Sequence, residues 1–166
     1  MRHPRDVLFA GEKPFPILPA VDHYAGSEKL MKKAMQLQQE LGPIFDITCD
    51  CEDGAHAGAE REHAEMAARL IMSADNAFNR VGARVHDVTH PHWRQDMEIL
   101  VGIAGSRLPF ITLPKPCSAG DVRVQLEALR DIEREHGVDR RIPVHVLIET
   151  RSEERRVGKE CLRLCR

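Results

Sequence analysis

Short apolar runs alternate with longer amphipathic segments along this chain, and that alternation restricts its fold more than any other feature. The apolar runs are predicted to form strands over 7–10, 16–21, 44–50, 83–87, 110–115 and 143–149. Apolar residues at helical spacing predict helices over 26–41, 58–78, 92–103 and 118–136. Strands and helices that alternate with short connections favour parallel strands, in either an open doubly wound sheet or a (β/α) barrel.

The turns after the first predicted strands contain no Gly-rich phosphate-binding motif, which an open Rossmann-type sheet would carry. We therefore expect an α/β fold of the TIM-like (β/α)8 barrel type. A complete barrel takes about 250 residues, so residues 1–150 are expected to form a partial barrel with about the first five of its βα units. Such a sheet has open edges, and the 166-residue product is expected to be insoluble or inactive on its own.

The final stretch, RSEERRVGKECLRLCR (151–166), differs from the rest of the chain. It is dense in Arg and Glu, and it lacks a strand pattern where a sixth βα unit should begin. A charged amphipathic helix is one interpretation. We favour the hypothesis that this tail is non-native or misread sequence.

Each predicted helix has an apolar face that should contact the sheet. Ser27 is the expected N-cap of the first helix. The expected buried positions are Leu30, Ala34, Leu37 and Leu41 in the first helix, Ala64, Ala67, Ala68 and Ile71 in the second, and Val122, Leu126, Leu129 and Ile132 in the fourth.

The composition is that of a soluble globular protein, with 42% hydrophobic and 30% charged residues and a formal net charge of −2. No long basic run indicates a nucleic-acid partner, and no apolar run approaches the length of a membrane helix. The first 20 residues are broken by Gly and Pro, unlike a signal peptide. Five cysteines, an odd number, disfavour a secreted disulfide framework. A cytoplasmic location is expected.

Strand alternation separates the side chains of TCDCEDGA (48–55) into two sets. Cys49 and Cys51 share the apolar face with Phe45 and Ile47, whereas Asp46, Thr48, Asp50 and Glu52 share the polar face. The cysteines are expected to pack in the core, since a structural zinc site normally has a wider C-x2–4-C spacing and a second ligand pair. Glu52 and Asp53 fall where the strand ends, and spacing alone supports a catalytic rim and a simple turn equally.

Arg84 and His86 point away from the apolar face of the predicted strand 83–87. A buried guanidinium requires a carboxylate, so Arg84 should meet either Asp50 or Glu52, or else a ligand. His86, His90 and His92 resemble a loose metal cluster. Direct metal binding by them is disfavoured, because two of these residues lie in a loop of unknown geometry.

Two further residues lie at strand ends. Glu149 shares a face with His145, and its carboxylate suits a hard divalent cation, although a solvated strand-end glutamate is the simpler interpretation. Lys115, after Pro114, is placed to position an anion, although an ordinary loop lysine is the simpler interpretation of this residue in isolation.

Four motifs in order, DCEDGA (50–55), ARVHD (83–87), LPKP (113–116) and VLIET (146–150), resemble those of the HpcH/HpaI aldolase and citrate lyase beta-subunit family. The family pattern has an acidic Asp-x-Glu-Asp after strand two, Arg-Val-Asn near strand three, Pro-Lys at strand four and Ile-Glu-Thr at strand five. The resemblance covers roughly residues 5–150. Any one motif is weak, but their order makes the resemblance specific.

The resemblance implies a barrel enzyme that makes or cleaves a carbon–carbon bond next to a thioester or a 2-oxo acid with Mg2+. It implies that Glu149 is a metal ligand, that Arg84, Glu52 and Asp53 are catalytic, and that Arg84, His86 and Lys115 bind substrate. The expected reaction cleaves a 3-hydroxyacyl-CoA of the malyl, citramalyl or citryl type into an acyl-CoA and a 2-oxo acid. The implied partners are these small molecules and, for a complete barrel, other copies in a trimer or hexamer.

Two departures from the family pattern weaken these expectations. His86 stands where many relatives have Asn. The second metal carboxylate of the family, an Asp in the next βα unit, would lie beyond Thr150, so this chain is expected to be an inactive truncation. A metal-dependent 2-oxo-acid aldolase without CoA and a non-catalytic barrel are the alternatives.

Overall fold

In a computed structural model, which describes residues 19, 21–54 and 57–149, strands and helices alternate along the chain. The strands are β1 (Asp22–Ala25), β2 (Asp46–Asp50), β3 (Val81–Arg84), β4 (Ile111–Pro114) and β5 (Val144–Leu147). The helices are α2 (Glu28–Leu41), α3 (Glu60–Met72), α4 (Trp93–Ala104) and α5 (Ala119–Glu135). All strand pairs are parallel. Among the described helices, none is long and apolar enough to cross a membrane.

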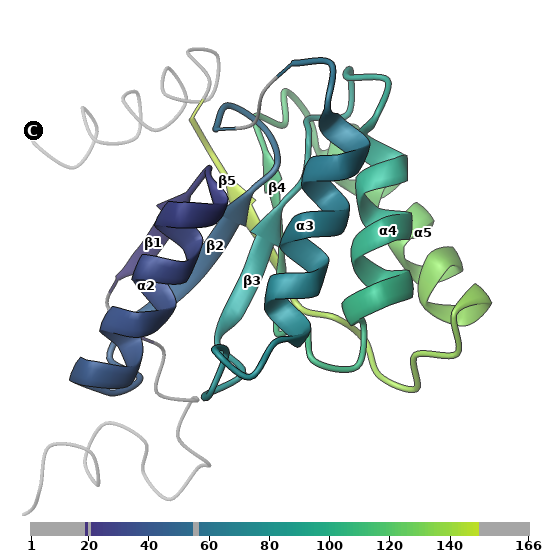
Figure 1. The fold of residues 1–166 in the computed structure, drawn as a ribbon. Helices are drawn as coiled ribbons and strands as arrows, with labels where there is room; N and C mark the ends of the chain where they lie inside the picture. Colours follow the sequence, from purple (N-terminus) through teal and green to yellow (C-terminus); the bar gives the residue numbers. More distant parts are fainter. Residues whose placement is uncertain (1–18, 20, 55–56, 150–166) are drawn as a thin grey trace, which may run out of the picture.

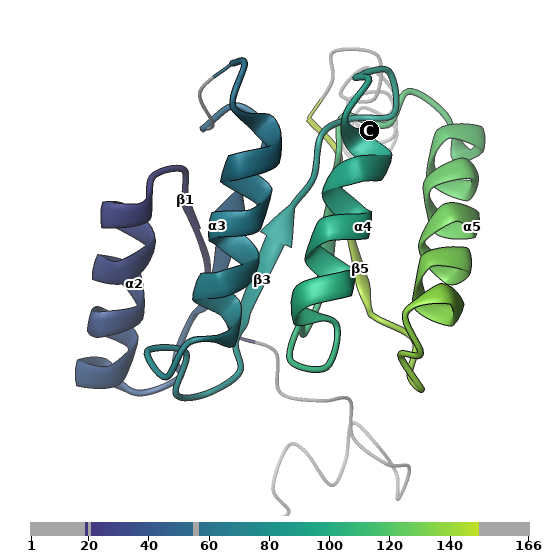
Figure 2. The ribbon, with the colours of Figure 1, turned by 45° about the vertical axis from the view of Figure 1, so that its right-hand side comes forward.

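The strand order identifies the architecture. The sheet runs β1-β2-β3-β4-β5 without a reversal, whereas an open doubly wound sheet reverses its strand order at a switch point. The helices also lie together on one face of the sheet (Figures 1 and 2). These two features confirm the predicted α/β fold as a partial (β/α) barrel. Within the described part of the chain, the outer edges of β1 and β5 have no strand partner.

The hydrophobic core lies between the sheet and the helices. Alternate strand residues pack against the helices with no exposed surface: Ile47, Cys49, Val81, Ala83, Ile111 and Leu113. The predicted alanine face of α3 is buried opposite them. Burial raises the pKa of the Cys49 thiol to about 12, so this cysteine stays protonated at neutral pH. Cys49 and Cys51 are free thiols buried in the core, which confirms the prediction that they pack there.

The buried face predicted for α2 is wrong at three of its four positions. Ala34 is buried, but Leu30, Leu37 and Leu41 are exposed. Instead the helix buries Met31, Met35 and Gln38. Gln38 can be buried because its side-chain amide donates a hydrogen bond of 2.6 Å to the Phe45 carbonyl. The N-cap is correct, since the Ser27 hydroxyl accepts from the backbone N–H of Leu30. In α5 the predicted face is confirmed, with Leu129 and Ile132 fully buried and Val122 and Leu126 partly buried.

Several predicted elements have different bounds in the structure, and the strand predicted over 83–87 matches β3 only at Ala83 and Arg84. The strand predicted over 16–21 is wrong at Pro19 and Val21, since β1 begins at Asp22. This strand was missed because its sequence, DHYA, carries polar side chains for the sheet face away from the helices and so lacks an apolar run. The helix predicted over 58–78 spans only 60–72. The remaining predictions, for 7–10, for 16–18 and for the tail 151–166, lie outside the described residues.

Candidate active site at the carboxyl ends of the strands

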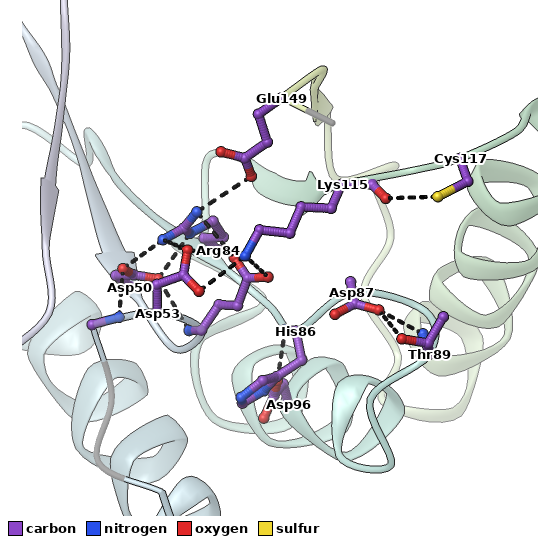
Figure 3. Close-up of polar contacts among 12 residues, drawn as sticks. Asp50, Asp53, Arg84, His86, Asp87, Thr89, Asp96, Lys115, Cys117 and Glu149 are labelled. Carbon is purple, nitrogen blue, oxygen red and sulfur yellow. Dashed lines mark hydrogen bonds and ion pairs between the residues drawn. The ribbon is translucent and has the colours of Figure 1, made fainter. Parts of the chain in front are cut away.

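Polar side chains from four neighbouring strands and their following loops meet at one edge of the sheet (Figure 3). In parallel sheets the carboxyl ends of the strands share an edge, which is where barrel enzymes place their chemistry. Four of the predicted site residues are joined there by direct contacts: Glu52, Asp53, Arg84 and Lys115. Glu149 lies at the margin of this group, and His86 lies beside it.

Arg84 and Asp50 form a buried bidentate ion pair, which we call the fork, at the base of the site. The two residues are partners in the register of β2 and β3. Arg84 Nε donates to Asp50 Oδ1 at 2.8 Å and Nη2 donates to Oδ2 at 2.7 Å, and both side chains are only 8% exposed. This planar two-bond geometry is the strong form of an Arg–carboxylate pair. It confirms the interpretation in which a protein carboxylate pairs with the guanidinium.

The backbone after β2 holds Asp50 in place. Its carboxylate accepts hydrogen bonds from the N–H groups of Glu52 and Gly54, each at 3.0 Å. Burial opposes the charged form of Asp50, but these bonds and Arg84 lower its pKa below the ordinary value. A Cβ at position 54 would lie 2.7 Å from Asp50 Oδ2 and from the Gly26 Cα. Glycine is therefore the residue that lets this loop approach both neighbours.

Further carboxylates surround the same guanidinium. Arg84 Nη1 lies 3.0 Å from Glu52 Oε2 and 3.6 Å from Glu149 Oε1, while Nη2 lies 3.7 Å from Asp53. The Tyr24 ring centroid lies 5.3 Å from its central carbon. Burial alone would lower the pKa of Arg84, but Asp50, with help from the other carboxylates, raises it. Arg84 is therefore a permanent cation at the centre of the group.

Lys115 links the two carboxylates that follow β2. Its Nζ lies 3.0 Å from Glu52 Oε1 and 2.9 Å from Asp53 Oδ1. Burial is the main cause that raises the pKa of Glu52, and the cationic neighbours oppose it. Lys115 itself has a φ of 50°, in the left-handed region that is uncommon outside glycine. Backbone strain of this kind is characteristic of functional sites.

The remaining predicted residue, His86, is paired with a residue that the sequence did not indicate. His86 Nδ1 lies 2.6 Å from Asp96 Oδ2, and the His86 backbone N–H donates to the same oxygen at 3.0 Å. Asp96 is only 1% exposed on the buried face of α4. An aspartate within an otherwise apolar helix face, beside Met97, Leu100 and Val101, was the available signal. The His90 ring stacks on His86 at 3.9 Å between centroids.

A cavity of about 270 Å³ opens above these groups. Its lining combines acidic and basic side chains from three loops and one helix: Glu52, Asp53, Glu60, His86, Asp87, His90 and Lys115, with Ala57. Its mixed charge and modest volume suit a small polar ligand.

The oxygen donors of the site fit a hard divalent cation in chemistry, although no group of three metal ligands is assembled among the described residues. Glu52 Oε2 is buried without a hydrogen-bond donor, because its contact with Arg84 is not aligned for one. Four carboxylates surround two cationic side chains, Arg84 and Lys115, so negative charge is in excess. Magnesium needs only one or two protein carboxylates, with water and substrate completing its shell. Among the described residues, His86, His90 and His92 likewise do not assemble into a group of three ligands.

Comparison with solved structures finds strong similarity to one enzyme. The chain is 46% identical to a citrate lyase from Burkholderia xenovorans LB400, with a TM-score of 0.79, over 87% of this chain and 45% of that one. Two structures of malate synthase from Haloferax volcanii are 21% and 20% identical, with TM-scores of 0.66 and 0.70. One is described as a lead(II) complex and the other as a magnesium/glyoxylate complex. This likeness shows the fold alone.

The chain therefore spans about half the length of the solved structures that it resembles. Comparison with family models finds no match, and neither does comparison with curated proteins.

Proposed function

Because the chain belongs to the citrate lyase beta-like, HpcH/HpaI family, we propose that the protein carrying it is a carbon–carbon lyase. The proposed reaction cleaves a 3-hydroxyacyl-CoA of the malyl, citramalyl or citryl type into an acyl-CoA and a 2-oxo acid. The observation that supports this most directly is the guanidinium of Arg84, fixed among carboxylates at the carboxyl edge of the sheet. The proposal includes Mg2+ as cofactor and, for the complete barrel, assembly into a trimer or hexamer.

The chemical problem in this reaction is negative charge. When the carbon–carbon bond breaks, its electron pair becomes an enolate on the thioester fragment, and fixed positive charge lowers the energy of the transition state. Arg84 is rigid because Asp50 holds it by two hydrogen bonds. It therefore needs little reorganisation to stabilise substrate oxygens beside it. Mg2+, when bound, would add Lewis-acid stabilisation of the same developing charge.

The other site residues receive supporting roles in the proposal. Glu149, at the end of β5 and one-third exposed, would hold the metal. Glu52 and Asp53 would orient the water shell of the metal and the substrate. In the structure, both carboxylates contact Lys115. Lys115 is only partly buried, so it would be free to turn toward a substrate carboxylate when one enters the cavity.

The function can be tested with a chimaera, because this chain spans only part of its relative. Residues 21–149 would replace the matching part of the Burkholderia xenovorans citrate lyase, and acetyl-CoA release from malyl-CoA would be measured with and without Mg2+. Metal-dependent release is expected from the chimaera, whereas the 166-residue chain alone should give none. Release of products from a 2-oxo-acid aldol without any turnover of thioester would instead favour the aldolase alternative. No turnover of either substrate would favour a non-catalytic barrel.

Glu149→Gln in the chimaera tests the metal assignment. Removing one carboxylate charge should raise the Mg2+ concentration needed for half-maximal activity by about tenfold or more. Glu98→Gln is the matched control, since Glu98 is a partly exposed carboxylate on α4 that pairs with Arg94, away from the candidate site. If both variants required the same Mg2+ concentration as the parent, Glu149 would not be a ligand.

A further inference from the structure

His86 and Asp96 have the geometry of a proton-transfer pair. The hydrogen bond from the imidazole Nδ1 to Asp96 Oδ2 is 2.6 Å long, and the aspartate is buried with 1% of its surface exposed. Because Nδ1 is occupied by this bond, the ring can exchange a proton with a ligand only through Nε2. A carboxylate that binds one ring nitrogen in this way fixes the tautomer and the orientation of the imidazole, and thereby the role of the other nitrogen.

The surrounding structure fixes the ring further. His90 stacks on one face of it, with 11° between the two ring planes. From α5, the Gln125 side chain donates to the His86 backbone carbonyl at 3.3 Å. His86 itself lines the cavity together with Glu52 and Lys115. The imidazole is therefore held at the wall of the same cavity that the catalytic candidates line.

Charged groups face His86 from every neighbouring element. They are Asp96 on α4, Glu60 on α3, Glu52 and Asp53 after β2, Lys115 after β4, and Asp87, His90 and His92 in its own loop. Burial lowers the pKa of His86, but Asp96 outweighs this effect and raises it above the ordinary value. The pKa of His90 is lowered by burial and by its two histidine neighbours. Of the two stacked histidines, His86 is therefore the one that binds a proton more readily.

We propose that His86 is a general acid–base residue that exchanges a proton with the substrate oxygen, and that Asp96 is its positioning residue. The inference rests on the proposed function. In the cleavage direction, His86 Nε2 accepts the proton of the 3-hydroxyl group while the carbon–carbon bond breaks. The electron pair of that bond passes to the enolate of the acyl-CoA, and the carbon bearing the hydroxyl becomes the carbonyl of the 2-oxo acid. His86 then loses its proton to solvent while the enolate carbon takes one up, so no net proton is consumed.

A purely structural role for Asp96 makes a different prediction. Asp96 also accepts the His86 backbone N–H at 3.0 Å, so it could serve only to hold the loop. In that case the protonation of His86 would not depend on a ligand. In the proposed role, the product complex contains a protonated His86 that donates to the carbonyl oxygen. Binding of a 2-oxo acid should then raise the pKa of His86.

The test uses NMR titration of the histidine rings in the 15N-labelled chimaera, with pyruvate as the 2-oxo acid probe. The pKa of His86 should rise when pyruvate binds, and Asp96→Asn should lower it in the free chimaera while keeping an oxygen for the backbone N–H. His86→Asn should weaken pyruvate binding by about tenfold, the effect of losing one charge-assisted hydrogen bond. His92→Asn is the matched control, because His92 lies in the same loop and pairs with Gln95.

The outcomes separate the inference from the function. Three results would show that the His86–Asp96 pair does not act on the ligand. Pyruvate does not bind, it binds without changing the titration of His86, or it binds equally well to His86→Asn. His86→Gln provides a second replacement, and the dispersion of its amide spectrum shows whether it is folded. The proposed function fails separately, when the chimaera releases no acetyl-CoA although pyruvate binding and the His86 shift persist.

Discussion

Arg84 is the residue on which the candidate site depends, because its guanidinium contacts carboxylates from β2, from the loop after β2 and from the end of β5. Strand parity predicted that Arg84 and Asp50 share a face, and the register of the two strands makes them direct partners. The sequence thus contained enough information for this pair. It contained too little for Asp96, because no local pattern says which strand end an aspartate within a helix will meet.

Removing Asp50 should destabilise the protein strongly. Asp50→Ala leaves the Arg84 guanidinium buried without its fork partner, which is expected to cost about 3–5 kcal/mol in free energy of unfolding. Asp46→Ala is the control on the same strand, since Asp46 pairs with Arg80 at 3.0 Å where Arg80 is one-third exposed. That change should cost less than about 1 kcal/mol. Urea denaturation measures both, and equal losses would contradict the importance of the fork.

The same pair predicts a pH dependence. The pKa of Asp50 is lower in the folded protein than its ordinary value of 3.8. Its stabilising contribution is therefore fully present above that pH and is lost as the pH falls through the lower, folded pKa. Urea denaturation between pH 7 and pH 2 should show the gap between the parent and Asp50→Ala as constant above about pH 5 and shrinking in acid. A gap that persists unchanged at pH 2 would mean that this carboxylate does not carry the linkage.

At the scale of elements, α2 shows why helix existence was easier to predict than helix orientation. Leu30, Leu37 and Leu41 form a regular apolar stripe, but the structure buries the neighbouring stripe of Met31 and Met35. A pattern of spacing alone cannot choose between two apolar stripes when a glutamine belongs to the buried one. The choice depends on the hydrogen bond from Gln38 to Phe45, a contact made only after the chain turns into β2.

In the middle of the sheet, Gly82 of β3 lies directly against the ring of Phe110. A Cβ at Gly82 would lie 2.4 Å from the Phe110 ring, which is buried and stacks on His145 at 4.1 Å. Gly82→Ala should therefore displace the ring and destabilise the protein by about 1–3 kcal/mol. Gly120→Ala is the control, because the nearest atom to its Cβ would be the Ser118 hydroxyl at 3.2 Å in the first turn of α5. Thermal denaturation should show a lower Tm for Gly82→Ala alone, and an unchanged Tm would show that Phe110 moves without cost.

At the scale of the whole molecule, the order of elements restricted the fold to an open sheet or a barrel, because βα repeats with short connections permit few topologies. The lack of a Gly-rich phosphate-binding turn then favoured the barrel. The edge that carries the candidate site followed from the same reasoning, since parallel strands bring their carboxyl ends together. The cavity beside His86 did not follow, because its walls come from loops whose paths depend on tertiary contacts. Prediction from sequence therefore succeeded for the order of strands and helices and for the edge of the sheet at which the site lies. It failed for the cavity, which is formed by the loops that connect these elements.

The open sheet edge gives the last prediction. An apolar groove of about 280 Å³ lies along the β1 side of the sheet, lined by Val21, His23, Ala34, Leu37, Ile44 and Phe45. Val21 and Ile44 are 60% and 63% exposed there, next to a strand edge that has no partner in the described part of the chain. Exposed apolar surface beside an unpaired strand favours association with another copy.

The 166-residue chain on its own should consequently self-associate with increasing concentration in sedimentation velocity. Leu37→Glu places a charge in the groove, and the loss of one buried leucine contact should weaken association by about tenfold. Leu30→Glu is the matched control, because Leu30 is an exposed leucine on the same helix that does not line the groove. Equal weakening by both variants would indicate general charge repulsion rather than a contact through the groove. Both leucines are exposed on α2, and the helix signal of each variant shows whether a change in association comes from unfolding.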